Sequence, residues 1–93
     1  MDRNEEGTME AWIDQLAEAL GEDTLSERET SMILTAARDV AHRVERRITP
    51  VSTFLLGSAV GRSLAGNASR ADALQAAMDT LHSLLPAGAP EQA

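Results

Sequence analysis

The fold is decided around the segment Arg38–Arg47, which reads RDVAHRVERR and is followed directly by Ile48-Thr49-Pro50 and the apolar run Val51–Gly61. Four of the chain's eight arginines lie at the end of one expected helix, and a proline suited to a first helical turn opens the next. A helix carries partial negative charge at its C-terminus and offers unpaired N–H groups at its N-terminus. The segment therefore predicts a helix–helix hinge whose arginines either balance the helix dipole or bind an anion.

Hydrophobic spacing predicts four amphipathic helices, over residues 8–20, 27–46, 50–65 and 70–85, and no strand. The signals that set these bounds are N-caps at Thr8, Ser26, Thr49 and Ser69, the capping-box partner Glu29, and stops at Gly21 and Gly66-Asn67. Short connections between the helices predict an all-α, compact four-helix bundle over residues 8–85. Residues 1–7 and 86–93 lack a periodic pattern and are expected to be disordered.

The third expected helix is apolar around most of its circumference, which predicts a central position in the bundle. Gly57, Gly61 and Ala65 form a small-residue stripe that favours close packing against another helix, either within the chain or across a homodimer. On the intramolecular interpretation, Gly61→Leu should lower the free energy of unfolding by about 1–3 kcal/mol. Trp12 of the first helix is expected to be buried against the third.

Composition limits the functional classes. A chain of 93 residues without cysteine forms one domain with no disulfide and no thiolate chemistry, which suits a reducing compartment. Trp12 and Phe54 are the only aromatic residues, so base stacking is nearly excluded. The longest apolar run falls short of the roughly 18 residues that span a bilayer, and no secretory signal is evident. We expect a cytoplasmic protein with no membrane and no nucleic-acid partner.

Charge is distributed unevenly along the chain, whose net charge is −7. Residues 1–29 contain ten acidic residues against two arginines, whereas residues 30–70 contain two acidic residues against six arginines. The protein is therefore expected to be electrically polar from end to end, and its overall sign argues against general nucleic-acid binding.

Two carboxylate–histidine pairs, Asp39-x-x-His42 and Asp79-x-x-His82, have the spacing of di-metal sites in helix bundles. The third expected helix carries no carboxylate, and His42 lies opposite the apolar face of its helix, so we interpret both pairs as polar surface. No serine has an evident histidine–acid pair, and no glycine-rich phosphate loop follows a strand. The sequence predicts no metal, no cofactor and no enzyme activity.

The hinge supplies the candidate contact residues. Two interpretations stay open: an Asp39–Arg43 pair that fixes the turn, or a surface that binds an anion or a partner. Arg38 and His42 are expected to project outward, so Arg43→Ala should reduce stability more than Arg38→Ala. The candidate site residues are Arg38, Asp39, His42, Arg43, Arg46 and Thr49, with Arg47 beside them.

Three stretches, WIDQLAEALG at residues 12–21, ARDVAHRVER at 37–46 and PVSTFLLG at 50–57, followed by Gly61, resemble a small actinobacterial helical domain family of unknown function. Members of that family occur alone or at the C-terminus of molybdenum-cofactor guanylyltransferase-like proteins. The resemblance covers roughly residues 9–65. The chain departs from it at Arg47-Ile48-Thr49, where small residues or proline are expected.

The resemblance implies a non-enzymatic accessory or interaction domain for the maturation of molybdenum cofactor (molybdopterin guanine dinucleotide) or of molybdoenzymes. It assigns no catalytic residue. The expected partner is a protein, such as a molybdenum-cofactor nucleotidyltransferase or a molybdoenzyme accessory protein. The alternatives are an anion module that holds a nucleotide or pterin phosphate at the arginine hinge, and a structural homodimer built on the third helix.

Overall fold

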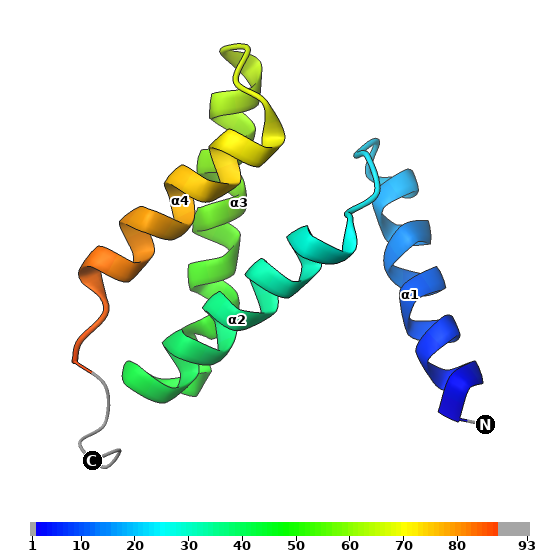
Figure 1. Ribbon diagram of the computed structural model, residues 1–93, viewed down its shortest axis with the longest axis horizontal. Coiled ribbons are helices and arrows are strands. Elements are labelled where there is room, and N and C mark those ends of the chain that lie inside the picture. The colour runs from blue at the N-terminus through cyan, green and yellow to red at the C-terminus, as the bar shows by residue number, and fades with distance from the viewer. Residues whose placement is uncertain (1, 88–93) are drawn as a thin grey trace.

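The computed structural model describes residues 2–87, which form four α-helices and one short 3-10 helix (Figure 1). The elements in chain order are α1 (Asp2–Ala19), α2 (Glu27–Arg43), η1 (Arg46–Ile48), α3 (Thr49–Ala65) and α4 (Arg70–Leu84). No strand occurs within residues 2–87. The predicted all-α fold with four helices is confirmed.

The helix starts at α2 and α4 follow the predicted caps. The Ser26 hydroxyl accepts a hydrogen bond from the Glu29 N–H at 3.1 Å, and the Glu29 carboxylate accepts one from the Ser26 N–H at 2.8 Å. This capping box satisfies two N–H groups that would otherwise lack partners. The Ser69 hydroxyl accepts from the Asp72 N–H at 3.1 Å in the same way.

The helix stops at α1 and α3 also follow the sequence. Gly21 and Asn67 both adopt the left-handed backbone conformation, with φ of 75° and 78°. At the first stop the Glu22 N–H donates to the Ala17 carbonyl at 2.8 Å, and the chain after Asn67 reaches back to α3 in the same pattern. These contacts form Schellman motifs, which pair the last carbonyls of each helix.

The hinge differs from its prediction. Helix α2 ends at Arg43 rather than Arg46, because Glu45 is extended (φ −169°, ψ 136°) and breaks the helical path. The 3-10 turn η1 then leads directly into α3, so that Ile48 occupies the capping position. Thr49 is consequently the first residue of α3 and makes no cap hydrogen bond.

The sequence predicted disorder at both ends of the chain. Helix α1 begins at Asp2, whereas the sequence predicted a start at Thr8 after a disordered segment. Acidic residues favour the first turn of a helix, and the segment before Thr8 carries three of them. At the other end, Pro86 and Ala87 lie outside any helix, and the remainder of the predicted tail, together with Met1, falls outside the described residues.

The core lies where α2, α3 and α4 meet. Its buried side chains come from α2 and α4: Ala36, Val40, Ala73, Leu74 and Met78. Helix α3 packs on both α2 and α4 and contributes half-buried side chains such as Leu56 and Val60. The alanines let the helices approach closely, so a small set of side chains fills the centre.

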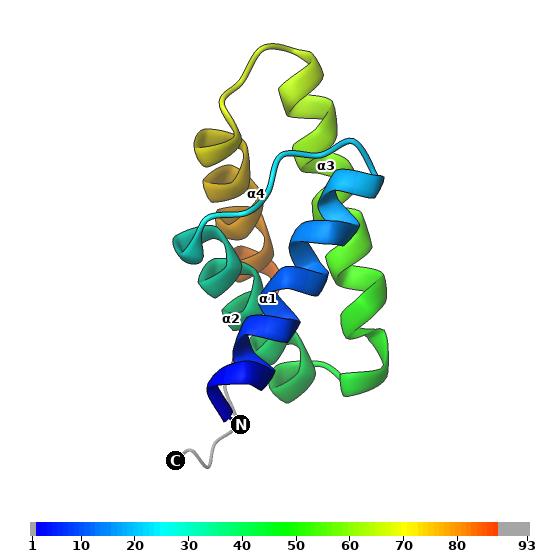
Figure 2. The ribbon, with the colours of Figure 1, turned by 90° about the vertical axis from the view of Figure 1, so that its right-hand side faces the viewer.

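Helix α1 stands apart from this body in Figure 1, and in Figure 2, which is turned by 90°, it lies in front of the other helices. Among the described residues, no Cα atom of α1 lies within 8 Å of a Cα atom in another helix. Trp12 is 57% exposed, so the prediction that it is buried against the third helix is wrong. Amphipathic spacing identifies the apolar face of a helix, but it does not identify the surface against which that face packs.

The outer face of α3 is open as well. Phe54 is 74% exposed, and its neighbours Val51 and Leu55 are also exposed. A Cβ atom added at Gly57 or Gly61 would have no neighbouring atom within 4 Å. The intramolecular close packing predicted for this stripe is therefore absent, and Gly61→Leu has no neighbour to displace within one chain.

Gly61→Ala is expected to raise the free energy of unfolding by about 0.5–1 kcal/mol, because alanine is the better helix former and the added methyl group meets open space. Urea denaturation at low protein concentration measures the change. Gly21→Ala is the control, and it should be destabilising because Gly21 has a φ of 75°. A Gly61→Ala variant less stable than the parent at this low concentration would place another helix of the same chain against this face of α3.

Candidate functional site

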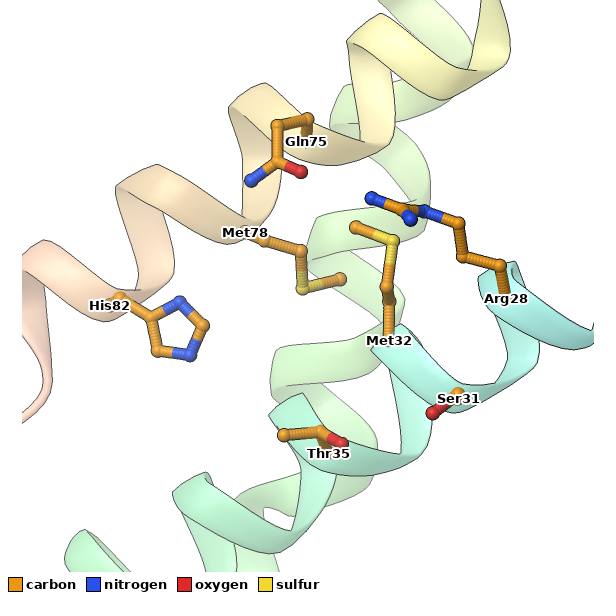
Figure 3. A pocket seen from close by; sticks show the side chains of 7 residues that line it. All are labelled: Arg28, Ser31, Met32, Thr35, Gln75, Met78 and His82. Carbon is orange, nitrogen blue, oxygen red and sulfur yellow. The ribbon is translucent and has the colours of Figure 1, made fainter.

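A groove of about 420 Å³ runs between α2 and α4 (Figure 3). Met32 from α2 and Met78 from α4 point toward each other at its floor. The residues that line it are Arg28, Ser31, Met32, Thr35, Gln75, Met78 and His82. It is open to solvent, apolar at the base and polar along the rim.

Helical spacing explains this mixture. The α2 residues that line the groove recur every three or four positions, which places them on one stripe of the helix. The α4 lining residues follow the same spacing. Met78 is buried in the core, whereas Met32 is half-buried beside it. Methionine side chains are flexible and polarisable, so such a floor adapts to ligands of different shape.

A contact between a histidine and an aspartate lies at one end of the groove. The His82 Nε2 atom lies 3.4 Å from an Asp39 carboxylate oxygen, which joins α4 to α2. The sequence predicted instead that Asp39 would pair with Arg43 along α2. That interpretation is not borne out, because α4 brings His82 to Asp39, and Arg43 forms no salt bridge with any side chain of residues 11–87.

The predicted contact residues divide into two groups. Arg38, Asp39 and His42 continue the α2 stripe that lines the groove, and both Arg38 and His42 are exposed. Arg43, the last residue of α2, borders the same stripe on its other side, whereas Arg46 lies on the 3-10 turn into α3, and both are exposed. The structure therefore places the four α2 candidates along or beside one stripe, and Arg46 and Thr49 apart from it.

The hinge has fewer free hydrogen-bond donors for an anion than the sequence suggested. The Ile48 and Thr49 N–H groups already donate to carbonyl oxygens of the 3-10 turn, and Pro50 has no N–H. The Thr49 hydroxyl is shielded from solvent and has no hydrogen-bond partner among the described residues. The first turn of α3 thus lacks the set of free donors that makes a helix N-terminus an anion site.

The strongest polar cluster is one that the sequence reasoning missed. Arg70 donates two hydrogen bonds to the Glu29 carboxylate, each 2.7 Å long. It also donates to the Asp23 carbonyl at 3.0 Å and the Thr24 carbonyl at 2.6 Å. This Arg70 clamp, as we call it, ties the start of α4 to the start of α2 and to the α1–α2 linker.

The clamp changes the acidity of its members. Hydrogen bonds from Arg70 and from the Ser26 backbone lower the pKa of Glu29 to about 2, against a smaller opposing effect of burial. The same Glu29 carboxylate raises the pKa of Arg70. The Arg70 guanidinium and the Glu29 carboxylate are already hydrogen-bonded to each other. The clamp therefore stabilises the fold and leaves neither group free for a reaction.

A sequence signal for Arg70 did exist. It is the first residue of α4, directly after the Ser69 cap. A cation at a helix N-terminus opposes the helix dipole, so it requires a compensating partner. Sequence spacing gives no means of identifying that partner, because Glu29 lies 41 positions away.

The described residues contain no group of three or more histidine and acidic side chains placed to hold a metal ion. Asp39 and His82 meet, but Asp79 instead accepts a hydrogen bond from Gln75. Within residues 2–87, none of the helices has both the length and the apolar character required to cross a membrane.

Comparison with known proteins gives one result. Residues 4–93 match a family model described as a domain of unknown function, DUF6457. No curated protein and no solved structure shows significant similarity to the chain. Since the match extends over nearly the whole sequence, the chain belongs to the DUF6457 family of domains of unknown function.

Proposed function

We propose that this protein is a non-enzymatic interaction domain that binds a segment of a protein partner in the groove between α2 and α4. The observation that carries the proposal is the groove itself, with its methionine floor and polar rim. Grooves of this kind between two helices receive amphipathic segments whose apolar side chains fill the floor. The occupant we propose is such a segment.

The charges around the groove specify the segment further. Arg28 stands at one end of the groove, and Arg38 and His42 extend its other end along α2. The net charge of the whole chain is −7, so this basic surface is opposite in sign to the molecule as a whole. A partner segment with an apolar centre and acidic ends complements them, and complementary charge favours both encounter and orientation.

The lining residues favour binding over catalysis. Ser31 and His82 both border the groove, but no hydrogen bond joins them in the described part of the chain. His82 contacts Asp39 through its Nε2 atom, and Glu29 is hydrogen-bonded to Arg70. The groove therefore offers recognition groups without the nucleophile–base contact that acyl or phosphoryl transfer requires.

The proposed setting is cytoplasmic, and the absence of cysteine fits a reducing compartment. The resemblance to domains of molybdenum-cofactor guanylyltransferase-like proteins supports the choice of first partner. We propose that this partner is a molybdenum-cofactor nucleotidyltransferase or a molybdoenzyme accessory protein. The domain would then assist the maturation of molybdopterin guanine dinucleotide or of its enzymes by docking.

Thr35→Arg tests the proposal, because Thr35 is exposed on the groove wall and arginine would fill the groove with charge. We expect this variant to keep its melting temperature and to lose at least about tenfold in affinity for the purified nucleotidyltransferase, measured by calorimetry. The matched control is Thr80→Arg, which makes the same substitution at an exposed α4 position outside the groove.

Equal affinity of both variants for the nucleotidyltransferase would overturn the groove as the binding surface. The absence of binding by the parent protein would overturn the choice of partner. A rise in melting temperature with GTP, lost in an Arg46→Ala variant, would instead support the anion module at the hinge.

A further inference from the structure

Two apolar helix faces are exposed to solvent, and they belong to different helices. The first is on α1, where Trp12, Ile13 and Leu16, together with Leu20 just after the helix, are exposed along one side. The second is the outer face of α3, with Val51, Phe54 and Leu55. Both lie outside the α2–α4 groove. Apolar faces of this extent on a small protein mark association surfaces.

The two faces differ in charge. Residues 11–23 of α1 and its linker contain four acidic residues and no basic residue. Residues 46–65, which cover η1 and α3, contain three arginines and no acidic residue. Contact between two α1 helices or between two α3 helices would pair segments whose net charges have the same sign. The arrangement that complements both apolar surface and charge is α1 against α3.

The path of the linker bears on whether α1 can pack on α3 of the same chain or only on α3 of another copy. The Glu22 N–H is bonded back to Ala17 of α1, and the Arg70 clamp holds the Asp23 and Thr24 carbonyls. Hydrogen bonds therefore hold the linker on both sides of the Glu22–Asp23 junction. In the structure the linker directs α1 away from its own body, as Figure 1 shows. The apolar face of α1 consequently remains for another molecule.

We propose that the chain forms a two-fold symmetric homodimer in which α1 of each copy packs on the outer face of α3 of the other. Reciprocal exchange covers both apolar faces in both copies and closes the assembly. The open surface at Gly61 and the small side chain of Ser58 allow the incoming helix to approach α3 closely. Asp14 and Glu18 lie on the side of α1 opposite this apolar face, so they remain in solvent and add only to the long-range attraction between the acidic α1 segment and the basic η1–α3 segment.

The first test is the molar mass in solution, from size-exclusion chromatography with light scattering over a range of concentrations. We expect twice the chain mass for the parent protein. Phe54→Glu is expected to raise the dimer dissociation constant at least about tenfold, because it places a charge in the apolar contact. Its circular dichroism should match the parent, since Phe54 is exposed within one chain.

The second test uses the absence of cysteine in the natural sequence. A Leu16→Cys chain mixed with a Phe54→Cys chain should form a disulfide-linked dimer of the two under mild oxidation. The control mixture is Leu16→Cys with Thr80→Cys, which places the second thiol at an exposed position on α4, and it should cross-link far less. Dilution of the double variant, Leu16→Cys with Phe54→Cys, reveals any link within one chain.

A monomeric parent at every concentration would overturn the proposal. An intrachain disulfide in the diluted double variant would overturn it too, because α1 would then cover its own α3. Equal cross-linking to Thr80→Cys would exclude the α1–α3 geometry. These outcomes are separate from the groove hypothesis, since Thr35→Arg should remain dimeric and Phe54→Glu should still bind the nucleotidyltransferase.

Discussion

Replacement of Arg70 by methionine is expected to lower the free energy of unfolding by about 3 kcal/mol, because the substitution removes four hydrogen bonds from a charged donor. The side chains of Arg70 and Glu29 are only 25% and 14% exposed, so solvent does not screen their interaction as it does on an open surface. Methionine preserves the aliphatic stem but leaves the Glu29 carboxylate without its cation. For a three-helix body with so small a core, this is a large part of the total stability.

Urea denaturation of Arg70→Met and Arg62→Met, side by side, measures the effect. Arg62 is an exposed arginine on α3 with no salt bridge among the described residues, so its loss should change stability by less than about 0.5 kcal/mol. Arg70→Lys should fall between the parent and Arg70→Met, because an ammonium cannot reproduce the two parallel bonds to Glu29. Equal stability of the two methionine variants would remove the clamp as a structural element.

Acid is expected to remove about 2 kcal/mol of stability through Glu29 alone, as the pH falls from about 5 to 2. The folded state lowers the pKa of Glu29 to about 2, whereas the unfolded chain has the ordinary value for a glutamate. Protons therefore bind the unfolded state first. The contribution of Glu29 is fully present above pH 5 and declines as the pH approaches its folded pKa.

Other carboxylates titrate in the same range, so the measurement is a difference between variants. Glu29→Gln should lower the free energy of unfolding at pH 7, and its deficit relative to the parent should shrink steadily toward pH 2. Glu27→Gln is the matched control, because Glu27 is an exposed acid in the same first turn of α2. A Glu29→Gln deficit that is constant from pH 7 to pH 2 would show that the Arg70 pair does not set the acidity of Glu29.

Features whose cause is local were predictable from the sequence. The capping box at Ser26 and Glu29, the cap at Ser69, and the stops at Gly21 and Asn67 involve residues within a few positions of one another. Their geometry is fixed by backbone chemistry that any helix end shares. These signals located α2, α3 and α4 to within a few residues.

Features whose cause is long-range were not predictable in this way. The sequence marked the α1 face that includes Trp12 as apolar, but burial depends on where the linker directs the helix. Asp39 had two basic neighbours on its own helix, yet its partner is His82 from α4. The groove was missed for the same reason, because it exists only where two stripes from distant segments face each other.

The small core has a consequence for how the protein responds to temperature. Two of its five buried side chains are alanines, Ala36 and Ala73, so unfolding of one chain hydrates little additional hydrocarbon. The heat capacity change of unfolding should then fall below the usual ~12–15 cal/mol/K per residue. A small heat capacity change flattens the stability curve, and a small unfolding enthalpy widens the melting transition. Calorimetry of a dilute sample should therefore show a low, broad endotherm, with stability that varies little between cold and ambient temperatures.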